Sequence, residues 1–292
     1  MRIRKRYILV LLILTLVVSV TTVTAKSILW EMSDEDTEIY MLGSIHLMKE
    51  GQYPLKDVIE NSFEKADYLV VEADTRNVDQ MALQTLIQEE GIYQDGQSLE
   101  DNLSTELYNK VTAKFKKYGL ESENINPMKP WLVGLNLSQL KMLNADYDPQ
   151  LGIDLYFLAK ADEKEVVEME SVDFQIKMFS SFSPELQELL IKDALNDETM
   201  FKDTLNELYK YWKNGDTEKL SQLLFEQLNE MPEMKPFYDK VFFERNVNMA
   251  NNIESYLDTP GTYFVILGAG HYVGDKGIVQ VLKDKGYDVN QL

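Results

Sequence analysis

The 292-residue chain carries 49 acidic against 29 basic residues, which gives it a formal net charge of −20 at neutral pH. This charge argues against nucleic acid and anionic membrane surfaces as partners, and it suits a well-solvated extracytoplasmic protein. The chain contains no cysteine, so it can form no disulfide and can offer no thiol as nucleophile or metal ligand. Hydrophobic burial must therefore stabilise the fold.

The N-terminus has the three parts of a secretory signal. Four basic residues fall within positions 2–6, an apolar run covers residues 7–20, and Val23-Thr24-Ala25 places small residues where a signal peptidase reads the chain. We therefore expect residues 1–25 to be removed and the protein to be secreted or otherwise extracytoplasmic. The alternative is an uncleaved N-terminal anchor, although this apolar run is short for a membrane span. Contact with a membrane is expected only through this segment.

The first elements after the signal are predicted to form a hairpin. Short strands at residues 27–30 and 38–42 stand on either side of an acidic turn at 33–36. A Gly-x-x-His sequence follows the second strand. A helix over residues 55–66, with apolar residues at helical spacing, then leads to a buried-type strand over 68–72.

The middle of the chain, residues 78–257, is mainly helical in its pattern, and we interpret it as an insertion within a single domain that spans residues 26–292. One strand, at 165–170, interrupts the helices and ends on an acidic residue. Asp154 is expected to cap a helix that starts at the next residue. Trp131, which follows a proline, is expected to be a buried aromatic residue of a helix.

The C-terminal part repeats the plan of the first. A strand at 262–267 leads to a second Gly-x-x-His sequence, a helix at 277–285 and a short final strand. The segments Ile39–His46 and Phe264–His271 are visibly alike, so we interpret them as parts of two copies of one β-loop-α-β unit. Open α/β sheets bind ligands at the carboxyl ends of their strands. We therefore predict an α/β protein whose mixed sheet is built from these two units, with the helical insertion over its functional edge.

The chain has two histidines, and each follows a glycine by three positions at the end of a predicted strand. Gly43 precedes His46, and Gly268 precedes His271. Histidine is the usual base near neutral pH and the commonest ligand of transition metals. A glycine lets the strand turn sharply and lets a substrate or metal approach the backbone. The pattern indicates a functional site; the alternative is two ordinary loop histidines satisfied by hydrogen bonds.

Two histidines need a third protein ligand to make a zinc or manganese site that still leaves a position for water. Glu72 ends the strand after the first loop and is the best candidate, because a parallel neighbour of the His46 strand would place it at the same edge. Glu170, at the end of the middle strand, is the second candidate, either as a ligand or as a partner that orients a histidine. Taken singly, each acid could instead be a solvated strand end.

Further motifs strengthen this interpretation by their order along the chain. The order is Gly-Ser-Ile-His46, Val-Val-Glu72, Gly-Ile-Asp154, Glu-Met-Glu170, Arg245-Asn246 and Gly-Ala-Gly-His271. In these motifs, and over nearly all of the chain after the signal, the sequence resembles the TraB/GumN family. This family also includes pheromone-shutdown proteins and the Tiki proteases, and it is related more distantly to ChaN-like and erythromycin-esterase proteins. The resemblance implies a Tiki/ChaN/erythromycin-esterase-like fold and a divalent-metal-dependent hydrolase, in Tiki's case a peptidase.

By the same resemblance, His46, His271 and Glu72 correspond to the metal-binding residues. Arg245 corresponds to a basic position suited to binding a carboxylate or a developing oxyanion; its alternative is an ordinary arginine on a helix surface. We expect a Mn²⁺, Co²⁺ or Zn²⁺ ion to lower the pKa of a bound water and to polarise a peptide carbonyl. Glu72 or Glu170 would act as the general base.

The expected substrate is a peptide or protein, bound in a cleft that the helical insertion forms. Two alternatives stay open. One is a metal-independent, esterase-like hydrolase in which a histidine and a carboxylate activate water. The other is a non-catalytic protein that binds a peptide, haem or metal. The sequence carries no signature of a particular oligomeric state.

Overall fold

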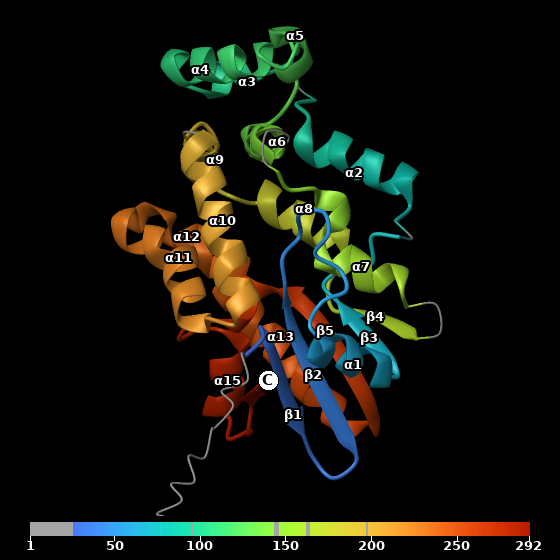
Figure 1. Cartoon of the computed structure of the whole chain (residues 1–292). Coiled ribbons are helices and arrows are strands. Elements are labelled where there is room, and N and C mark those ends of the chain that lie inside the picture. The colour runs from blue at the N-terminus through green and yellow to red at the C-terminus, as the bar shows by residue number, and fades with distance from the viewer. Residues whose placement is uncertain (1–25, 77, 95, 143–145, 162–163, 197) are drawn as a thin grey trace, which may run out of the picture.

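The computed structural model describes residues 26–292 apart from 77, 95, 143–145, 162–163 and 197 (Figure 1). The expected signal segment, residues 1–25, lies outside the described residues. Within the described part of the chain, no helix is both long enough and apolar enough to cross a membrane.

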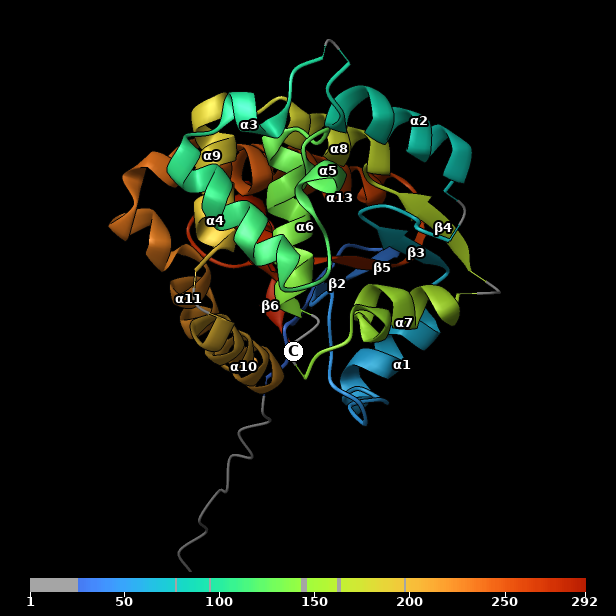
Figure 2. The ribbon, with the colours of Figure 1, turned by 90° about the horizontal axis from the view of Figure 1, so that it is seen from above.

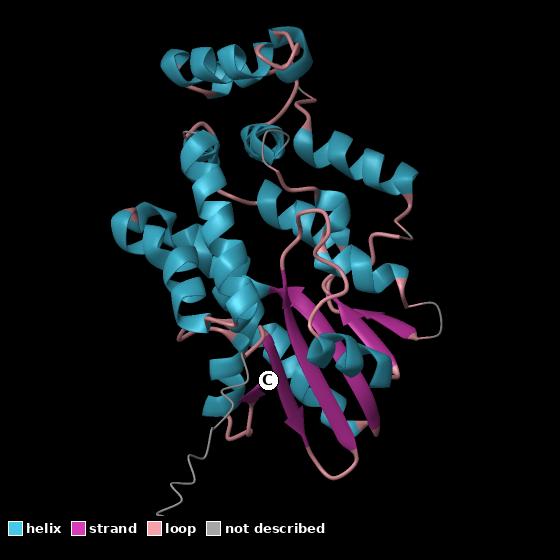
Figure 3. Ribbon diagram, in the orientation of Figure 1, coloured by secondary structure: helices cyan, strands magenta, loops and turns pink. Residues whose placement is uncertain are grey.

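A six-stranded mixed sheet forms the centre of the molecule (Figure 3). Its strands are β1 (Leu29–Ser33), β2 (Thr37–Ser44), β3 (Tyr68–Val71), β4 (Glu165–Glu168), β5 (Gly261–Gly268) and β6 (Asn290–Gln291). They lie in the order β4-β3-β5-β2-β1-β6. The β2–β5, β5–β3 and β3–β4 pairs are parallel, whereas β1 runs antiparallel to β2 and to β6. The predicted α/β class and mixed sheet are confirmed, and each predicted strand is present.

The predicted N-terminal hairpin consists of β1 and β2. Leu29 pairs with Leu42 at its open end. In the turn, the carboxylate of Asp34 accepts hydrogen bonds from the backbone amides of Asp36 and Thr37, an arrangement that favours a tight acidic turn.

The two β-loop-α-β units are interlocked. β5, from the C-terminal unit, lies between β2 and β3 of the N-terminal unit, with Ser44 opposite Gly268 and Val71 opposite Ile266. The expectation that β3 neighbours β2 is therefore wrong. β5 takes the central place because its residues 263–267 are buried, as a parallel strand covered on both faces requires. The carboxyl ends of β2, β5, β3 and β4 still meet at one edge.

Helices cover both faces of the sheet and its carboxyl edge. α1 (Asp57–Lys65) and α7 (Ile153–Ala159) lie on one face, and α13 (Glu244–Ser255), with α15 (Ile278–Asp284) packed against it, lies on the other (Figure 2). Most helices of the middle of the chain lie beyond the carboxyl ends of the strands, and β4 is the one strand described between β3 and β5 (Figure 1). These helices are α2 (Gln80–Gly91), α3 (Leu99–Asn102), α4 (Thr105–Lys116), α5 (Ser122–Ile125), α6 (Pro130–Met142), α8 (Val172–Ser180), α9 (Pro184–Ala194), α10 (Glu198–Asn214), α11 (Thr217–Glu230) and α12 (Lys235–Tyr238).

The predicted helices over residues 55–66 and 277–285 are present as α1 and α15. Trp131 in α6 is 1% exposed and donates its indole N–H to the carbonyl of Glu90 at 3.0 Å, so it is the buried helix aromatic that the sequence predicted. A second apolar cluster, away from the sheet, joins α4, α6 and α9 through side chains such as Val111 and Ile191.

One carboxylate ties α7 to α1. Glu60 of α1 accepts hydrogen bonds from the hydroxyl of Tyr156 at 2.9 Å, from Nζ of Lys160 at 2.7 Å and from the backbone amide of Leu55 at 2.7 Å. Burial opposes the charged form of Glu60, but the bonds from Lys160, Leu55 and Tyr156 outweigh it and lower the pKa of the carboxyl below its ordinary value of 4.5.

We expect Glu60→Gln to lower the free energy of unfolding by about 1–3 kcal/mol near neutral pH. Because the folded-state pKa of Glu60 is lowered, the stability that it contributes is present above the unfolded pKa and is lost as the pH falls through the folded pKa. The difference between parent and variant in urea denaturation should therefore shrink in acid. Glu106→Gln, which removes an exposed pair with Lys110, is the control and should change stability little. An equal loss at all pH values would contradict the linkage.

Candidate functional site

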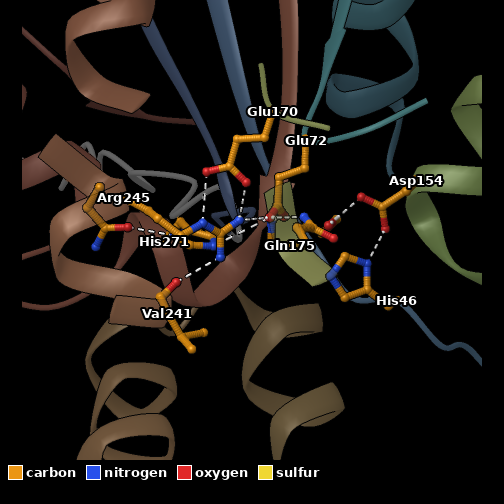
Figure 4. A network of polar contacts seen from close by, with 11 residues as sticks. His46, Glu72, Asp154, Glu170, Gln175, Val241, Arg245 and His271 are labelled. Carbon is orange, nitrogen blue, oxygen red and sulfur yellow. Dashed lines mark hydrogen bonds and ion pairs between the residues drawn. The ribbon is translucent and has the colours of Figure 1, made fainter. Parts of the chain in front are cut away.

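Five side chains gather at the carboxyl edge of the sheet (Figure 4). Arg245, Glu72, Glu170 and His271 form one polar network, whereas His46 pairs with Asp154 beside it. His46 follows β2, Glu72 follows β3, Glu170 follows β4 and His271 follows β5, so each of four strands leads to one residue. Arg245 reaches the same place from the start of α13. The structure thus brings together all five residues that the sequence singled out as ligands or catalytic groups.

Gly43 serves packing rather than a turn. A Cβ at this position would lie 2.5 Å from Cγ2 of Ile28, so only glycine allows β2 to pass so close to its neighbour. The carbonyl of Gly43 accepts the indole N–H of Trp212 at 2.6 Å, which fixes α10 against the strand. Neither Gly43 nor Gly268 has a positive φ, so neither glycine adopts the left-handed conformation.

Gly268 leaves space at the centre of the network. A Cβ there would lie 3.6 Å from Oε2 of Glu72, 3.6 Å from Cδ2 of His271 and 3.7 Å from Nε2 of His46. These three side chains therefore converge on one point, which we call the Gly268 gap. A side chain at position 268 would fill the gap that the three proposed ligands share.

His271 is buried, with 3% of the residue exposed, and lies in the short helix α14 (Ala269–Tyr272) rather than on an open loop. Its Nδ1 lies 2.6 Å from Oδ1 of Asn246, and its ring centroid lies 5.3 Å from that of Phe242. Burial lowers the pKa of His271 to about 4, so its imidazole is neutral near neutral pH. A neutral imidazole is the form that binds a metal ion.

His46 has the opposite surroundings. It lies on the loop after β2, and its side chain is 66% exposed. Its Nδ1 lies 2.8 Å from Oδ2 of Asp154, whose Oδ1 accepts the hydroxyl proton of Ser44 at 2.9 Å. The charge of Asp154 raises the pKa of His46 to about 9. In the metal-free protein, the two motif histidines therefore differ in protonation near neutral pH.

Glu72 accepts hydrogen bonds at both oxygens. Its Oε2 accepts the backbone amide of Gly268 at 3.2 Å, and its Oε1 accepts Gln175 at 3.4 Å as well as a bond from Arg245. Oε1 also lies 3.7 Å from Nε2 of His271. Burial opposes the charged form, but electrostatic interactions with His271, Arg245 and His46 lower the pKa of Glu72. Near neutral pH, where His271 is neutral, the positive charges are those of Arg245 and His46. The network therefore holds an ionised carboxylate beside the gap.

Arg245 bridges the two acids. Its side chain is 7% exposed, which excludes the alternative of an ordinary surface arginine. It binds Glu170 through Nε at 2.8 Å and through Nη2 at 2.6 Å, and Nη2 also binds Glu72. Nη1 donates at 2.8 Å to the carbonyl of Val241, which lies in the π-helical turn η3 (Asp239–Phe243). Such turns are frequent at functional sites. The contacts of Arg245 hold Glu72 and Glu170 in place.

Asp154 and Asn246 are neighbours of the histidines whose roles the sequence did not reveal. The expectation that Asp154 caps a helix starting at Leu155 is wrong, because α7 starts at Ile153 and the Asp154 carboxylate turns toward His46. Both residues belong to motifs that the sequence analysis singled out, Gly-Ile-Asp154 and Arg245-Asn246. Spacing alone, however, does not show which oxygen meets which ring when the partners lie far apart in the chain.

A cleft of about 370 Å³ opens beside His46. The other described hollows of the surface are lined by neither histidine. The polar side of the cleft includes Glu72, Asp154 and Gln175, and the rest is largely apolar, as is usual for small-molecule and peptide sites. The apolar side includes Val71, Ala73, Pro149, Leu155 and Leu158.

The donor set fits a divalent metal ion in its chemistry. Both histidine rings bind protein oxygens through Nδ1 and leave Nε2 for another partner, the usual pattern of metal-binding histidines. Glu72 and Glu170 also place two carboxylates against the guanidinium of Arg245. Among the residues that the structure describes, no three His, Asp or Glu side chains already stand close enough to hold an ion. Nε2 of His46 already lies beside the gap, 3.7 Å from the place where a Cβ of residue 268 would stand.

Comparison with known proteins agrees with the motifs. The protein YbaP of Escherichia coli is 23% identical over 246 residues, which cover 84% of this chain and 87% of YbaP. Two metalloprotease TIKI homologs match over shorter parts. The homolog of Amphimedon queenslandica is 36% identical over 77 residues (25% of this chain, 15% of that protein), and that of Nematostella vectensis is 24% identical over 172 residues (48% and 35%). No solved structure is significantly similar. The TraB/PrgY/gumN family profile matches residues 28–291, and the chain therefore belongs to this family.

Proposed function

We propose that this protein is an exported metal-dependent hydrolase that cleaves peptide bonds, with His46, His271 and Glu72 as the metal ligands. The observation that carries the proposal is the convergence of these three side chains on the Gly268 gap. The metalloprotease names of the two TIKI homologs support it over the parts of the chain that they match.

A divalent ion at the gap would lower the pKa of a water and polarise the carbonyl under attack. The chain's own groups would prepare that place. Arg245 keeps Glu72 charged and oriented, and Glu170 holds Arg245 through both carboxylate oxygens. We therefore assign Glu170 to positioning. Glu72 is the acid at the gap, so we assign to it, rather than to Glu170, the carboxylate chemistry there, as a ligand of the ion or as the base that takes a proton from water.

The esterase-like alternative is less well supported. A metal-free mechanism needs one imidazole that accepts a proton from water, whereas the convergence of two histidines and Glu72 on the Gly268 gap is the arrangement of a three-ligand metal site. His271 is neutral but buried. A binding protein without turnover would use the same three donors, and only an assay separates it from an enzyme.

The test is metal analysis of the purified exported protein together with a peptide-library assay. We expect about one Mn²⁺, Co²⁺ or Zn²⁺ ion per chain and peptide cleavage that a chelator abolishes and added metal restores. Cleavage that persists without metal would favour the esterase-like mechanism. One bound ion without cleavage of any peptide would favour the binding protein, and absence of both would overturn the proposal.

Export is tested on the same material by N-terminal sequencing. We expect the mature chain to start at Lys26, because the residues before it carry the pattern of a signal peptide. An intact Met1 in the membrane fraction would instead show that the segment is an anchor.

A further inference from the structure

The two Gly-x-x-His motifs are alike in sequence, yet an oxygen from outside the motif meets each histidine at the same ring atom. Nδ1 of His46 lies 2.8 Å from Oδ2 of Asp154, and Nδ1 of His271 lies 2.6 Å from Oδ1 of Asn246. One partner is a carboxylate from α7 and the other is an amide from α13. The two histidine rings are therefore oriented alike, by partners that lie outside the Gly-x-x-His motifs.

The orientation of Asn246 determines which nitrogen of His271 carries the proton. Nδ2 of Asn246 donates to the carbonyl of Lys276 at 2.8 Å, so Oδ1 is the atom that faces the ring. An amide oxygen only accepts hydrogen bonds, and Nδ1 of His271 must therefore carry a proton. In the neutral ring, Nε2 is then left with a lone pair, 3.7 Å from Oε1 of Glu72.

Asp154 has the same effect on His46. Its Oδ1 accepts the hydroxyl proton of Ser44, which is 3% exposed, and its Oδ2 faces the ring. A carboxylate whose two oxygens are both used in this way is fixed in direction. Nδ1 of His46 must therefore donate, and Nε2 is the ring atom that remains for a partner at the Gly268 gap.

The two rings differ in how firmly the surrounding chain holds them. His271 is buried, and Phe242 packs against its ring and against Gly270, where a Cβ would lie 2.7 Å from Cε1 of the phenyl ring. The His46 side chain is 66% exposed, and Asp154 is the side-chain partner that the structure gives it. Loss of Asp154 should therefore release His46, whereas loss of Asn246 should change the protonation of a ring that stays in place.

We propose that Asp154 and Asn246 are the positioning residues of the site: each accepts the Nδ1 proton of one histidine, so that both Nε2 atoms are presented to the Gly268 gap. As an account of metal binding, this inference rests on the proposed function. The arrangement of ring protons, however, exists in the metal-free protein and can be measured there.

The experiment is nitrogen-15 NMR of the imidazole rings in the metal-free full chain. Because the chain has only two histidines, two sets of ring signals are expected, and His46→Gln assigns them. We expect His271 to be protonated at Nδ1 and unprotonated at Nε2. Asn246→Ala should remove that preference, with Asn246→Ser in its place should the alanine variant not fold. Asp154→Ala should move the His46 signals alone, and Asp154→Asn, which keeps an acceptor oxygen, should restore them in part.

Two controls remove similar polar groups without touching either ring. Asp148→Asn changes a carboxylate in the segment before α7, and Asn126→Ala removes the amide that accepts the hydroxyl of Tyr108. Both should leave the histidine signals unchanged. In metal titrations, the Asp154→Ala and Asn246→Ala variants should bind about 10–100-fold more weakly than the parent.

The outcomes separate this inference from the proposed function. Two results would overturn the positioning roles even if the protein binds metal. One is a parent His271 that is protonated at Nε2, and the other is imidazole signals that do not change in the Asp154→Ala and Asn246→Ala variants. Ring signals that behave as expected in a protein that binds no metal would uphold the positioning roles and overturn the metal-dependent function instead.

Discussion

His271→Ala and His46→Ala should each abolish tight metal binding, but only His271→Ala should greatly reduce stability. His271 is buried, and its removal leaves a cavity beside Phe242 and an unpaired oxygen on Asn246. We expect it to lower the free energy of unfolding by about 2–4 kcal/mol. The His46 side chain is 66% exposed, so its pair with Asp154 is screened by solvent and the loss should stay below about 1 kcal/mol.

Both effects can be measured on the same preparations, by equilibrium metal titration and by urea denaturation of the metal-free proteins. Glu60→Gln is the matched control, because it weakens the contact between α1 and α7 without removing a proposed ligand. It should lose stability and keep metal affinity. If the His46/His271 double variant binds one ion as tightly as the parent, the metal site lies elsewhere in the chain.

Glu72→Gln should lower metal occupancy and activity together, whereas Glu170→Gln should spare metal binding. Glu72 lies at the Gly268 gap, 3.7 Å from Nε2 of His271, and its amide replacement would be a poorer ligand and could not act as a base. We expect turnover to fall by about 100-fold or more. Glu170 binds Arg245 through two charge-assisted hydrogen bonds, and Glu170→Gln should lower the free energy of unfolding by about 1.5–3 kcal/mol.

The two variants form a matched pair, because each replaces one carboxylate partner of the same arginine. Metal titration, turnover of a cleaved peptide and urea denaturation should be compared side by side. Should Glu170→Gln lose the metal while Glu72→Gln keeps it, the roles of the two acids must be exchanged.

Local patterns predicted the elements of the fold well, because periodicity depends on neighbouring residues. The alternation of apolar residues indicated β1 and β2, and the apolar run at 262–267 indicated β5. The order of the strands did not follow from such patterns. The sequence of a buried parallel strand is apolar whichever strands lie beside it. The local sequence therefore did not show that β5 would lie between β2 and β3.

At the site, too, local patterns predicted some features, and others depend on tertiary packing. His46, Glu72, Glu170 and His271 could be singled out because each stands at or near the end of a recognisable strand, and strand ends meet at one edge of a sheet. The partners of the two rings could not be deduced in this way, because contacts between residues 46 and 154, or between 246 and 271, arise only when the helices are packed. The burial of His271 also depends on tertiary packing, since Phe242 covers its ring.

The central position of β5 also determines when the protein can fold. Along its whole length β2 pairs with β5, from Thr37 opposite Gly261 to Ser44 opposite Gly268. The pairing therefore closes a loop that contains most of the chain. Closing such a long loop costs conformational entropy and makes folding slow. During synthesis, the middle of the sheet cannot form until the residues of β5, up to Gly268, have been made. Under the export that we propose, this delay would keep the chain unfolded while it crosses a membrane.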